Sequence, residues 1–284
     1  MILDIKTLAH GIIGEIEMTV KKLNTKPSLT IIMAGNNSAS EVYVRNKIKT
    51  CESIAIKTAL IHLPEDISQT ELKDHIHKLN TDETVHGILV QSPLPGNISA
   101  QEIFDIIHPL KDVDGFCSTN IAHLYSGDET GLIPGTPKGI MKIIEHYLET
   151  KHSSIEGKHA VVIGKSTIVG KPLSLMLMHA GATVTVCHSR TKDLSAHTKN
   201  ADIIISAVGK KDIITTDMVK PGALVIDVGI NVTDDESRKL SGDCETGSIC
   251  EIADITPVPG GVGPMTIAML LSNVLLAHSL QGKN

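Results

Sequence analysis

Apolar residues recur at two spacings along the first third of the chain, and these spacings predict alternating helices and strands. Short apolar runs bounded by turn residues predict strands over 28–34, 58–63 and 85–90, and a helix begins at about Ser40. Two capping boxes, Ser68 to Glu71 and Ser99 to Glu102, indicate the starts of two further helices. The opening stripe at helical spacing predicts an amphipathic helix and consists of Ile5, Leu8, Ala9, Ile12, Ile13 and Ile16.

The alternation resumes in the second half of the chain after a passage rich in Gly, Pro and Asp from Pro109 to Pro137. Strands that alternate with helices are typical of a doubly wound α/β protein with parallel sheets. Because 284 residues suffice for two domains of ordinary size, we expect two three-layer α/β domains, over residues 1–118 and 119–263, with a cleft between them. The later apolar runs predict strands over 160–163, 183–187, 202–206 and 223–228.

The tail combines a stiff loop, Thr256 to Pro264, with a long apolar helix. Pro264 falls near the first helical position, where the missing N–H is tolerated. This helix over 264–282 either packs back onto the first domain or caps the second, and the pattern leaves both placements open. Its apolar stripe consists of Ile267, Leu270, Leu271, Val274, Leu275 and His278.

Composition excludes several classes of protein. A net charge of −6 with 41% hydrophobic and 20% charged residues indicates a globular protein and argues against a nucleic-acid or acidic-membrane partner. We expect no membrane span and no secretory signal, because no apolar run reaches ~20 residues and the first residues lack a basic-then-apolar pattern. Five scattered cysteines without C-x-x-C spacing indicate a reducing cytoplasm. Fourteen histidines form no recognisable ligand pattern, so we expect no metal site.

A glycine-rich loop is the first candidate for chemistry. The apolar run 160–163 leads into Gly164-Lys165-Ser166-Thr167-Ile168-Val169-Gly170, and a helical pattern follows. A strand, loop and helix in this order seat the pyrophosphate of a dinucleotide on the N–H groups at the helix start. Ser166 replaces the second glycine of G-x-G-x-x-G and Gly170 comes one residue late. A structural alternative therefore stays open, in which Gly164 ends a buried strand and Gly170 permits close packing.

The end of the following strand indicates which dinucleotide binds. NAD enzymes place a carboxylate there for the ribose 2′-hydroxyl, whereas NADP enzymes place cationic or hydroxyl groups there for the 2′-phosphate. Ser189, Arg190 and Thr191 stand at this strand end, and Lys165 adds a charge in the loop. The pattern favours NADP over NAD.

Three further patterns place polar groups where a substrate could bind. Tyr43 and Lys47 stand four residues apart on one face of a predicted helix, although solvated lysines give the same pattern. Gln91 follows a buried strand, and ligands of open α/β sheets bind at the carboxyl ends of strands. Asp112 and Asp114 lie in the loop at the domain joint, where paired aspartates also serve as turns or caps.

A Tyr-x-x-x-Lys pair in an NADP protein is also found in short-chain dehydrogenases. Those enzymes carry the glycine loop near the N-terminus and the Tyr/Lys pair downstream of it. Here Lys47 lies far before Gly164, so the order of motifs excludes that class.

Taken in order, six blocks resemble the bifunctional methylenetetrahydrofolate dehydrogenase/methenyltetrahydrofolate cyclohydrolase family over nearly the whole chain. They are Tyr43-x-x-x-Lys47, 90–95, 111–116, 134–139, the Gly164 loop and 256–266. The resemblance implies a homodimer that binds reduced folate in the cleft and NADP on a Rossmann-type second domain, with the helix over 264–282 packed on the first. It implies oxidation of 5,10-methylenetetrahydrofolate, with hydride transfer to NADP⁺, followed by hydration of the methenyl cation to 10-formyltetrahydrofolate.

The resemblance also implies roles for individual residues. Lys47 would be the central catalytic group, positioned and tuned by Gln91, while Asp114 holds the pterin and Tyr43 stacks along the aminobenzoyl part. The remaining substrate-binding positions are Val90, Pro93, Leu94, Gly261 and Pro264. The implied cofactor-binding positions are Thr136, Gly164, Lys165, Ser166, Ser189, Arg190 and Ile230.

Some positions depart from the family pattern. Gly135 stands where many relatives have Cys, Ser92 where Leu is common, and Lys165 where Arg reaches toward the 2′-phosphate. Lys keeps the charge of Arg and loses its bidentate fork. Residues 243–249 also depart from the usual Gly-Asp-Val-Asp block.

Two other functions compete with this interpretation. Another two-domain NADP dehydrogenase, similar to shikimate dehydrogenase, would also place Lys and Asp in its cleft, but the Tyr43 helix and the Gln91-x-Pro-x-Pro turn argue against it. A non-catalytic NADP-binding protein is disfavoured because Lys47, Gln91 and Asp114 are all intact.

Overall fold

A computed structural model describes residues 1–96, 98–128, 130–232 and 240–282 of the protein. The chain forms two compact units. We call residues 11–135 and 267–284 the three-stranded unit, and residues 1–10 and 136–266 the five-stranded unit, after their sheets. The two units divide after Gly135, whereas the sequence pattern predicts a domain boundary at residue 118.

The three-stranded unit is built around a central strand, β1 (Ser28–Ala34), with β2 (Lys57–Leu63) and β3 (Gly87–Val90) parallel to it on either side. Side chains of β1 alternate between two hydrophobic cores, as the period of two requires. Leu29, Ile31 and Met33 point into one core, and Ile32 and Ala34 into the other. Both faces of β1 are therefore buried, which explains why most of its residues are apolar.

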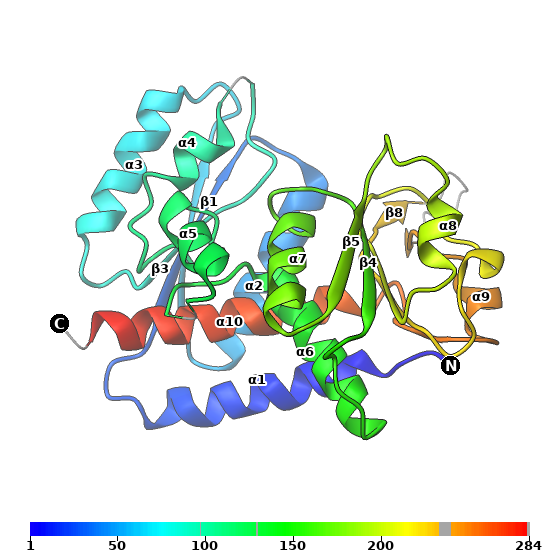
Figure 1. Ribbon diagram of the computed structural model, residues 1–284. Helices are drawn as coiled ribbons and strands as arrows, with labels where there is room; N and C mark the ends of the chain where they lie inside the picture. The colour runs from blue at the N-terminus through cyan, green and yellow to red at the C-terminus, as the bar shows by residue number, and fades with distance from the viewer. Residues whose placement is uncertain (97, 129, 233–239, 283–284) are drawn as a thin grey trace. The chain divides into compact units, whose positions relative to one another are not determined.

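Helices cover both faces of this small sheet (Figure 1). One core includes residues of α1 (Ile5–Lys22), α2 (Ser38–Ser53) and α10 (Val262–Gln281). The other includes residues of α3 (Gln69–Thr81) and α4 (Ala100–Phe104). The short helix α5 (Ser118–Ser126) follows the loop that carries Asp114.

The five-stranded unit has the parallel strand order β10-β7-β6-β4-β5. Because the chain leaves β4 on one side to form β5 and then crosses to form β6 on the other, the carboxyl end of β4 is a topological switch point, where such sheets bind ligands. The strands are β4 (His159–Ile163), β5 (Thr183–Cys187), β6 (Ile203–Ser206), β7 (Leu224–Asp227) and β10 (Asp254–Ile255). The connecting elements are α6 (Gly135–Thr150), α7 (Gly170–His179), α8 (Leu194–Thr198), η1 (Thr216–Met218), β8 (Asn231–Val232), β9 (Leu240–Ser241) and α9 (Thr246–Ile249).

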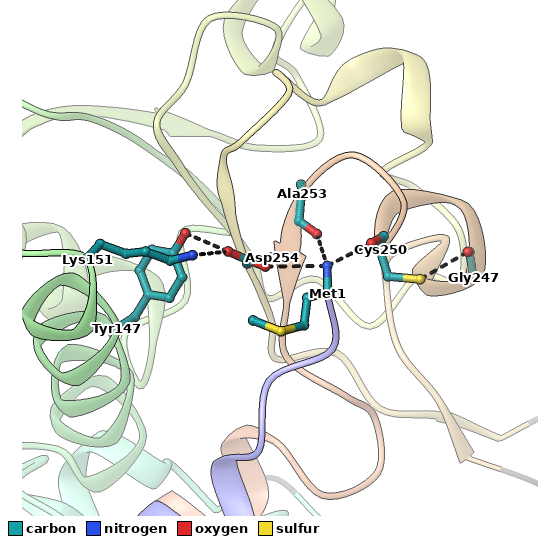
Figure 2. A network of polar contacts seen from close by, with 7 residues as sticks. All are labelled: Met1, Tyr147, Lys151, Gly247, Cys250, Ala253 and Asp254. Carbon is teal, nitrogen blue, oxygen red and sulfur yellow. Dashed lines mark hydrogen bonds and ion pairs between the residues drawn. The ribbon is translucent and has the colours of Figure 1, made fainter.

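The first residues of the chain join the five-stranded unit through a polar network (Figure 2). The Met1 amino group donates to Cys250 O at 2.7 Å and to Ala253 O at 2.6 Å. It also lies 3.4 Å from the Asp254 carboxylate, which accepts a hydrogen bond from the Tyr147 hydroxyl at 2.8 Å. The network fixes this segment beside β10, where Ile2 forms a parallel bridge with Ile255.

The predicted fold class is confirmed, since the three-stranded and five-stranded sheets are parallel and their strands alternate with helices; only the short pair β8–β9 of the described residues is antiparallel. The capping box at Ser68 is also confirmed. The box at Ser99 is only half formed: its side chain accepts from Glu102 N–H, but the Glu102 carboxylate turns to Lys73, and Gln69 accepts the Ser99 N–H instead. Partners distant in sequence compete here with the local pattern.

Helix α10 is long and apolar enough, by length and composition alone, to cross a membrane, and half of its most apolar window is buried inside the protein. Leu270, Leu271, Val274 and Ala277 lie in the same core as β1, with exposures between 0% and 3%. The apolar character of this helix is therefore accounted for by packing in a protein core.

Candidate active site

Helix α2 brings Lys47 into a buried position beside the end of β3. The helix begins after Asn37, whose side chain accepts from Ser40 N–H at 3.0 Å. Lys47 is only 6% exposed, and its Nζ donates to Gln91 Oε1 at 3.1 Å. The Tyr43 ring, one turn earlier on the same face, has its centre 5.0 Å from Lys47 Nζ. The structure therefore brings these three predicted site residues together.

The orientation of Gln91 follows from the end of the strand. Its backbone N–H donates to Ile32 O at 2.9 Å, which extends the β1–β3 ladder by one residue beyond Val90. Its side-chain Nε2 donates to Ser92 O at 2.7 Å, so the amide oxygen faces Lys47. The chain then turns at a cis Ser92–Pro93 bond. Val90 is buried, Leu94 packs against the core below, and Pro93 is exposed.

Asp114 lies in a loop held against the outer edge of β3. Ile88 N–H donates to Lys111 O at 2.7 Å, and Asp112 forms a parallel bridge with Ile88. Because this bridge is parallel, the residues after Asp112 run toward the carboxyl end of β3, where Gln91 lies. Gly115 follows Asp114 with a φ of +69°, in the left-handed region that favours glycine.

Burial sets the electrostatics of the site. Burial lowers the pKa of the Lys47 amino group, and the negative charge of Asp114 opposes this shift. Burial also raises the pKa of Asp114 to about 6, partly offset by Lys47 and reinforced by Asp112. Cys51, one turn below Lys47, has its pKa raised to about 12 by burial and so stays a neutral thiol. A lowered pKa makes the neutral form of a buried amine easier to populate, and the neutral amine is the form that accepts a proton.

The glycine loop lies at the switch point of the five-stranded sheet. Gly164 has a φ of +118°, and a Cβ there would stand 2.5 Å from Ala207 O, so both backbone and space require glycine. A Cβ on Gly170 would collide with Gly164 O. Ser166, at the predicted second-glycine position, closes the loop: its Oγ accepts from Val169 N–H at 3.2 Å and from Gly170 N–H at 3.3 Å.

Cationic and hydroxyl groups surround this loop at the carboxyl ends of β4 and β5. Lys165, Ser166, Ser189 and Arg190 line this edge, and all four side chains are exposed. The turn after β5 is fixed by His188 N–H, which donates to Thr191 Oγ1 at 2.9 Å. The side chains present at this edge suit a phosphate-bearing dinucleotide.

Four other predicted site residues belong to the five-stranded unit. Thr136 Oγ1 lies 3.0 Å from Thr266 Oγ1. Ile230 is 57% exposed just after β7. Gly261 is buried, and a Cβ there would collide with Pro257 O; Pro264 lies half-buried in the first turn of α10.

Sequence reasoning missed a buried carboxylate pair that shapes the edge of this sheet. Asp243 is fully buried and accepts from the Val208 and Lys210 N–H groups at 2.9 and 2.8 Å. Asp227, 1% exposed, accepts from the Asp243 and Cys244 N–H groups at 2.8 and 2.9 Å. These aspartates act as internal caps for loops. The available signal in the sequence was the glycine before Asp243. The structure shows why glycine is needed there: a Cβ on Gly242 would overlap the Asp227 carboxylate.

Sequence reasoning also missed two buried asparagines near Asp114. Asn120 is 3% exposed and Asn273 is fully buried, and both hydrogen-bond to the loop that carries Asp114. An Asn inside the apolar stripe of the tail helix was the available signal, because a buried amide needs hydrogen-bond partners.

Two protein-family models together match most of the chain. Residues 3–114 match the model of the tetrahydrofolate dehydrogenase/cyclohydrolase catalytic domain. Residues 134–282 match the model of the tetrahydrofolate dehydrogenase/cyclohydrolase NAD(P)-binding domain.

Individual relatives are similar in sequence or structure over almost the whole chain. The bifunctional protein FolD of Paracidovorax citrulli is 51% identical over 91% of this chain and 89% of its own. The structure of the FolD methylenetetrahydrofolate dehydrogenase/cyclohydrolase of Campylobacter jejuni is similar with a TM-score of 0.93 and 47% identity, covering 99% of both chains. That of the Trypanosoma brucei enzyme, complexed with NADP and an inhibitor, has a TM-score of 0.93 and 32% identity, covering 100% of this chain and 99% of its own.

The rival dehydrogenase class is much more distant. Shikimate dehydrogenase from Aquifex aeolicus has a TM-score of 0.52 and 15% identity, covering 92% of this chain and 95% of its own. That likeness is one of fold alone.

Proposed function

This chain belongs to the tetrahydrofolate dehydrogenase/cyclohydrolase family, and on that premise we propose that it oxidises 5,10-methylenetetrahydrofolate with NADP⁺ and hydrolyses the resulting methenyl compound to 10-formyltetrahydrofolate. The observation that carries this function is the buried Lys47 amino group, which lies 3.1 Å from the Gln91 amide oxygen and whose lowered pKa is partly raised again by the charge of Asp114. These are the groups that the family pattern places around the folate.

Hydration of the methenyl cation needs a base that removes a proton from water. Lys47 supplies it, because burial lowers the pKa of its amino group and favours the neutral amine. Gln91 accepts a hydrogen bond from Lys47 and carries no charge. A negative charge at this position would favour the protonated amine. A glutamate at this position would raise the pKa of Lys47 and weaken it as a base at neutral pH.

The oxidation step depends on alignment of substrate and cofactor more than on proton transfer. NADP⁺ would supply the hydride acceptor for this step. The Gly164 loop and the start of α7 would hold its pyrophosphate, and Lys165, Ser189 and Arg190 would hold its 2′-phosphate. Thr136, Ser166 and Ile230 would complete the cofactor contacts. The residues fit NADP because the side chains at this edge are cationic or hydroxylic.

Substrate contacts on the three-stranded unit follow the same pattern. Tyr43 stacks along the aminobenzoyl part, and Asp114 accepts hydrogen bonds from the pterin. Val90, Pro93 and Leu94 provide apolar contacts around Gln91. The family pattern adds Gly261 and Pro264 as further substrate contacts.

One experiment tests the proposed function. Methylenetetrahydrofolate is added to the enzyme with NADP⁺, and the absorbances of NADPH and methenyltetrahydrofolate are followed together, with NAD⁺ and with shikimate in parallel cuvettes. Lys47→Met should abolish hydrolysis of methenyltetrahydrofolate while NADP binding persists. Cofactor binding without turnover in the wild type would support the non-catalytic alternative. Equal rates of hydrolysis by Lys47→Met and wild type would show that Lys47 is not the base of this step.

The cellular setting follows from the same family membership. We propose a cytoplasmic homodimer that supplies formylated folate to one-carbon metabolism and purine biosynthesis. All five cysteines lie within the described residues as free thiols, which is consistent with a reducing compartment. Light scattering coupled to gel filtration tests the dimer, and a monomeric mass would contradict it.

A further inference from the structure

Two segments of the three-stranded unit approach each other closely at the residue after Asp114. A Cβ on Gly115 would stand 2.5 Å from Leu132 O and 2.8 Å from the Ile133 carbonyl carbon. The Asp114 turn therefore rests directly on the backbone of residues 132–134. Its position depends on how these two segments are held together.

Two buried asparagine side chains join the two segments. Asn120 Nδ2 donates to Asp112 Oδ2 at 3.0 Å, and its Oδ1 accepts from Leu132 N–H at 3.3 Å. Asn273 Nδ2 donates to Val113 O at 2.8 Å and to Ile133 O at 2.7 Å. Each amide thus bridges one atom of the Asp114 loop and one atom of the segment under Gly115.

Asn273 stands out because its helix is otherwise a core helix. It is 0% exposed and lies between Leu270 and Val274, which pack into the core around β1. A polar amide in such a place costs stability unless its donors are satisfied. Here Nδ2 donates to two carbonyl groups beside Asp114, one of them on the residue immediately before it.

Asp112 holds the same loop from its inner side. Its carboxylate accepts from Gly115 N–H at 3.1 Å and from Cys117 N–H at 2.8 Å. The Asp114 turn is therefore fixed by Asp112 on one side and by Asn273 on the other. Asp112 belongs to the loop itself, whereas Asn273 comes from a helix more than a hundred residues later.

We propose that Asn273 is a positioning residue for folate binding: by joining Val113 O to Ile133 O, it holds the Asp114 carboxylate at the place from which it contacts the pterin and acts electrostatically on Lys47. The proposal deepens the function proposed above and rests on it. It makes the carboxyl-terminal helix part of the substrate site through a side chain that touches no substrate.

The test compares Asn273→Leu with a matched variant on the same helix, Gln281→Met. Gln281 Nε2 donates to His86 O at 2.7 Å and to Leu110 O at 3.1 Å, so it also joins two segments of this unit. The two carbonyl groups that it joins belong to the residue before β3 and to the residue before Lys111, so neither is adjacent to Asp114. Both variants remove a bridging amide from α10, and only one of these amides bonds to the residue before Asp114.

We expect Asn273→Leu to lower kcat/KM for methylenetetrahydrofolate about ten- to a hundredfold, chiefly through KM, because a displaced carboxylate no longer meets the pterin. The Kd for NADP should stay within about twofold of wild type. The acid limb of the hydrolysis pH profile should move to lower pH, since Asp114 opposes the lowering of the pKa of Lys47. Gln281→Met should lose comparable thermal stability and keep the wild-type KM and pH profile.

The outcomes separate cleanly. Equal folate KM values and pH profiles in the two variants would overturn the positioning role and leave the proposed function standing. A wild-type protein that turns over no folate would refute the proposed function itself. If Asn273→Leu does not fold, Asn273→Ser carries the same comparison, since it keeps one donor and should show a smaller shift in the same direction.

Discussion

Replacing Asp114 by asparagine should make the protein more stable at neutral pH while it weakens folate binding. Burial raises the pKa of this carboxyl group to about 6, whereas the aspartate of an unfolded chain titrates near its ordinary value of 3.8. Between these values the native state holds a proton that the unfolded state has lost, so stability falls as the pH rises through this window. An asparagine side chain carries no charge at any of these pH values and would not show this loss.

The size of the effect follows from the width of the window. A difference of about two pKa units corresponds to about 3 kcal/mol at pH 8, where both states of the wild type are ionised. At pH 5 about half of that remains, because the native carboxyl group is then mostly protonated. Asp114 is only half-buried and lies near the charge of Lys47, and both features weaken the effect of burial. We therefore expect Asp114→Asn to raise the free energy of unfolding by about 2–3 kcal/mol at pH 8.

Urea unfolding of wild type and Asp114→Asn at pH 5 and pH 8, followed by circular dichroism, measures the difference. Asp128→Asn is the matched control in the same unit, because hydrogen bonds from Thr130 and His123 lower the pKa of Asp128 to about 2. That variant should lose stability at neutral pH, the opposite sign. A stability difference for Asp114→Asn that is the same at both pH values, or negative at pH 8, would refute the electrostatic argument.

Three further substitutions follow from local geometry. Gly115→Ala places a Cβ 2.5 Å from Leu132 O in a left-handed conformation, so it should cost at least about 1–2 kcal/mol in urea unfolding and raise the folate KM, with NADP affinity retained. An unchanged folate KM would contradict this. Ser166→Ala removes the hydroxyl that accepts from Val169 and Gly170 N–H and should lower stability by about 1 kcal/mol; a melting temperature equal to wild type would count against that capping role. Lys165→Arg should tighten NADP about fivefold in a fluorescence titration by restoring a bidentate fork, and NAD binding should not change. An equal gain for NAD would show that the 2′-phosphate is not the partner.

Features with a local cause were predictable from the sequence, and features with a distant cause were not. The run over 28–34 predicts β1 to the residue, because a strand buried on both faces is mostly apolar, with Thr30 as a buried polar exception. The Ser99 box failed in its second half because Lys73, on another helix, binds the Glu102 carboxylate at 3.0 Å. Spacing alone also placed Tyr43 and Lys47 on one face, and the structure shows that face turned inward.

The supports beneath the site belong to the unpredictable class for the same reason. Asn273 reads in sequence as an isolated polar residue in an apolar helix, and nothing local reveals its two carbonyl partners. Asp112 reads as one of two similar aspartates. Only the fold shows that Asp112 is buried among backbone N–H groups, while the charge of Lys47 acts on the pKa of Asp114.

On the proposed function, the two reactions make opposite demands on the charge of the site, and the Lys47–Asp114 arrangement answers both. While the neutral methylene compound is bound, the Asp114 charge opposes the lowering of the pKa of Lys47 and favours the ammonium form. Oxidation then creates a cation next to that amine, and a like charge at short range lowers the pKa of Lys47 further. The product of the first reaction therefore favours the neutral amine that the second reaction needs as its base. Without Asp114, its charge would no longer oppose the burial that lowers the pKa of Lys47, so the ammonium form would be less favoured while the methylene compound is bound.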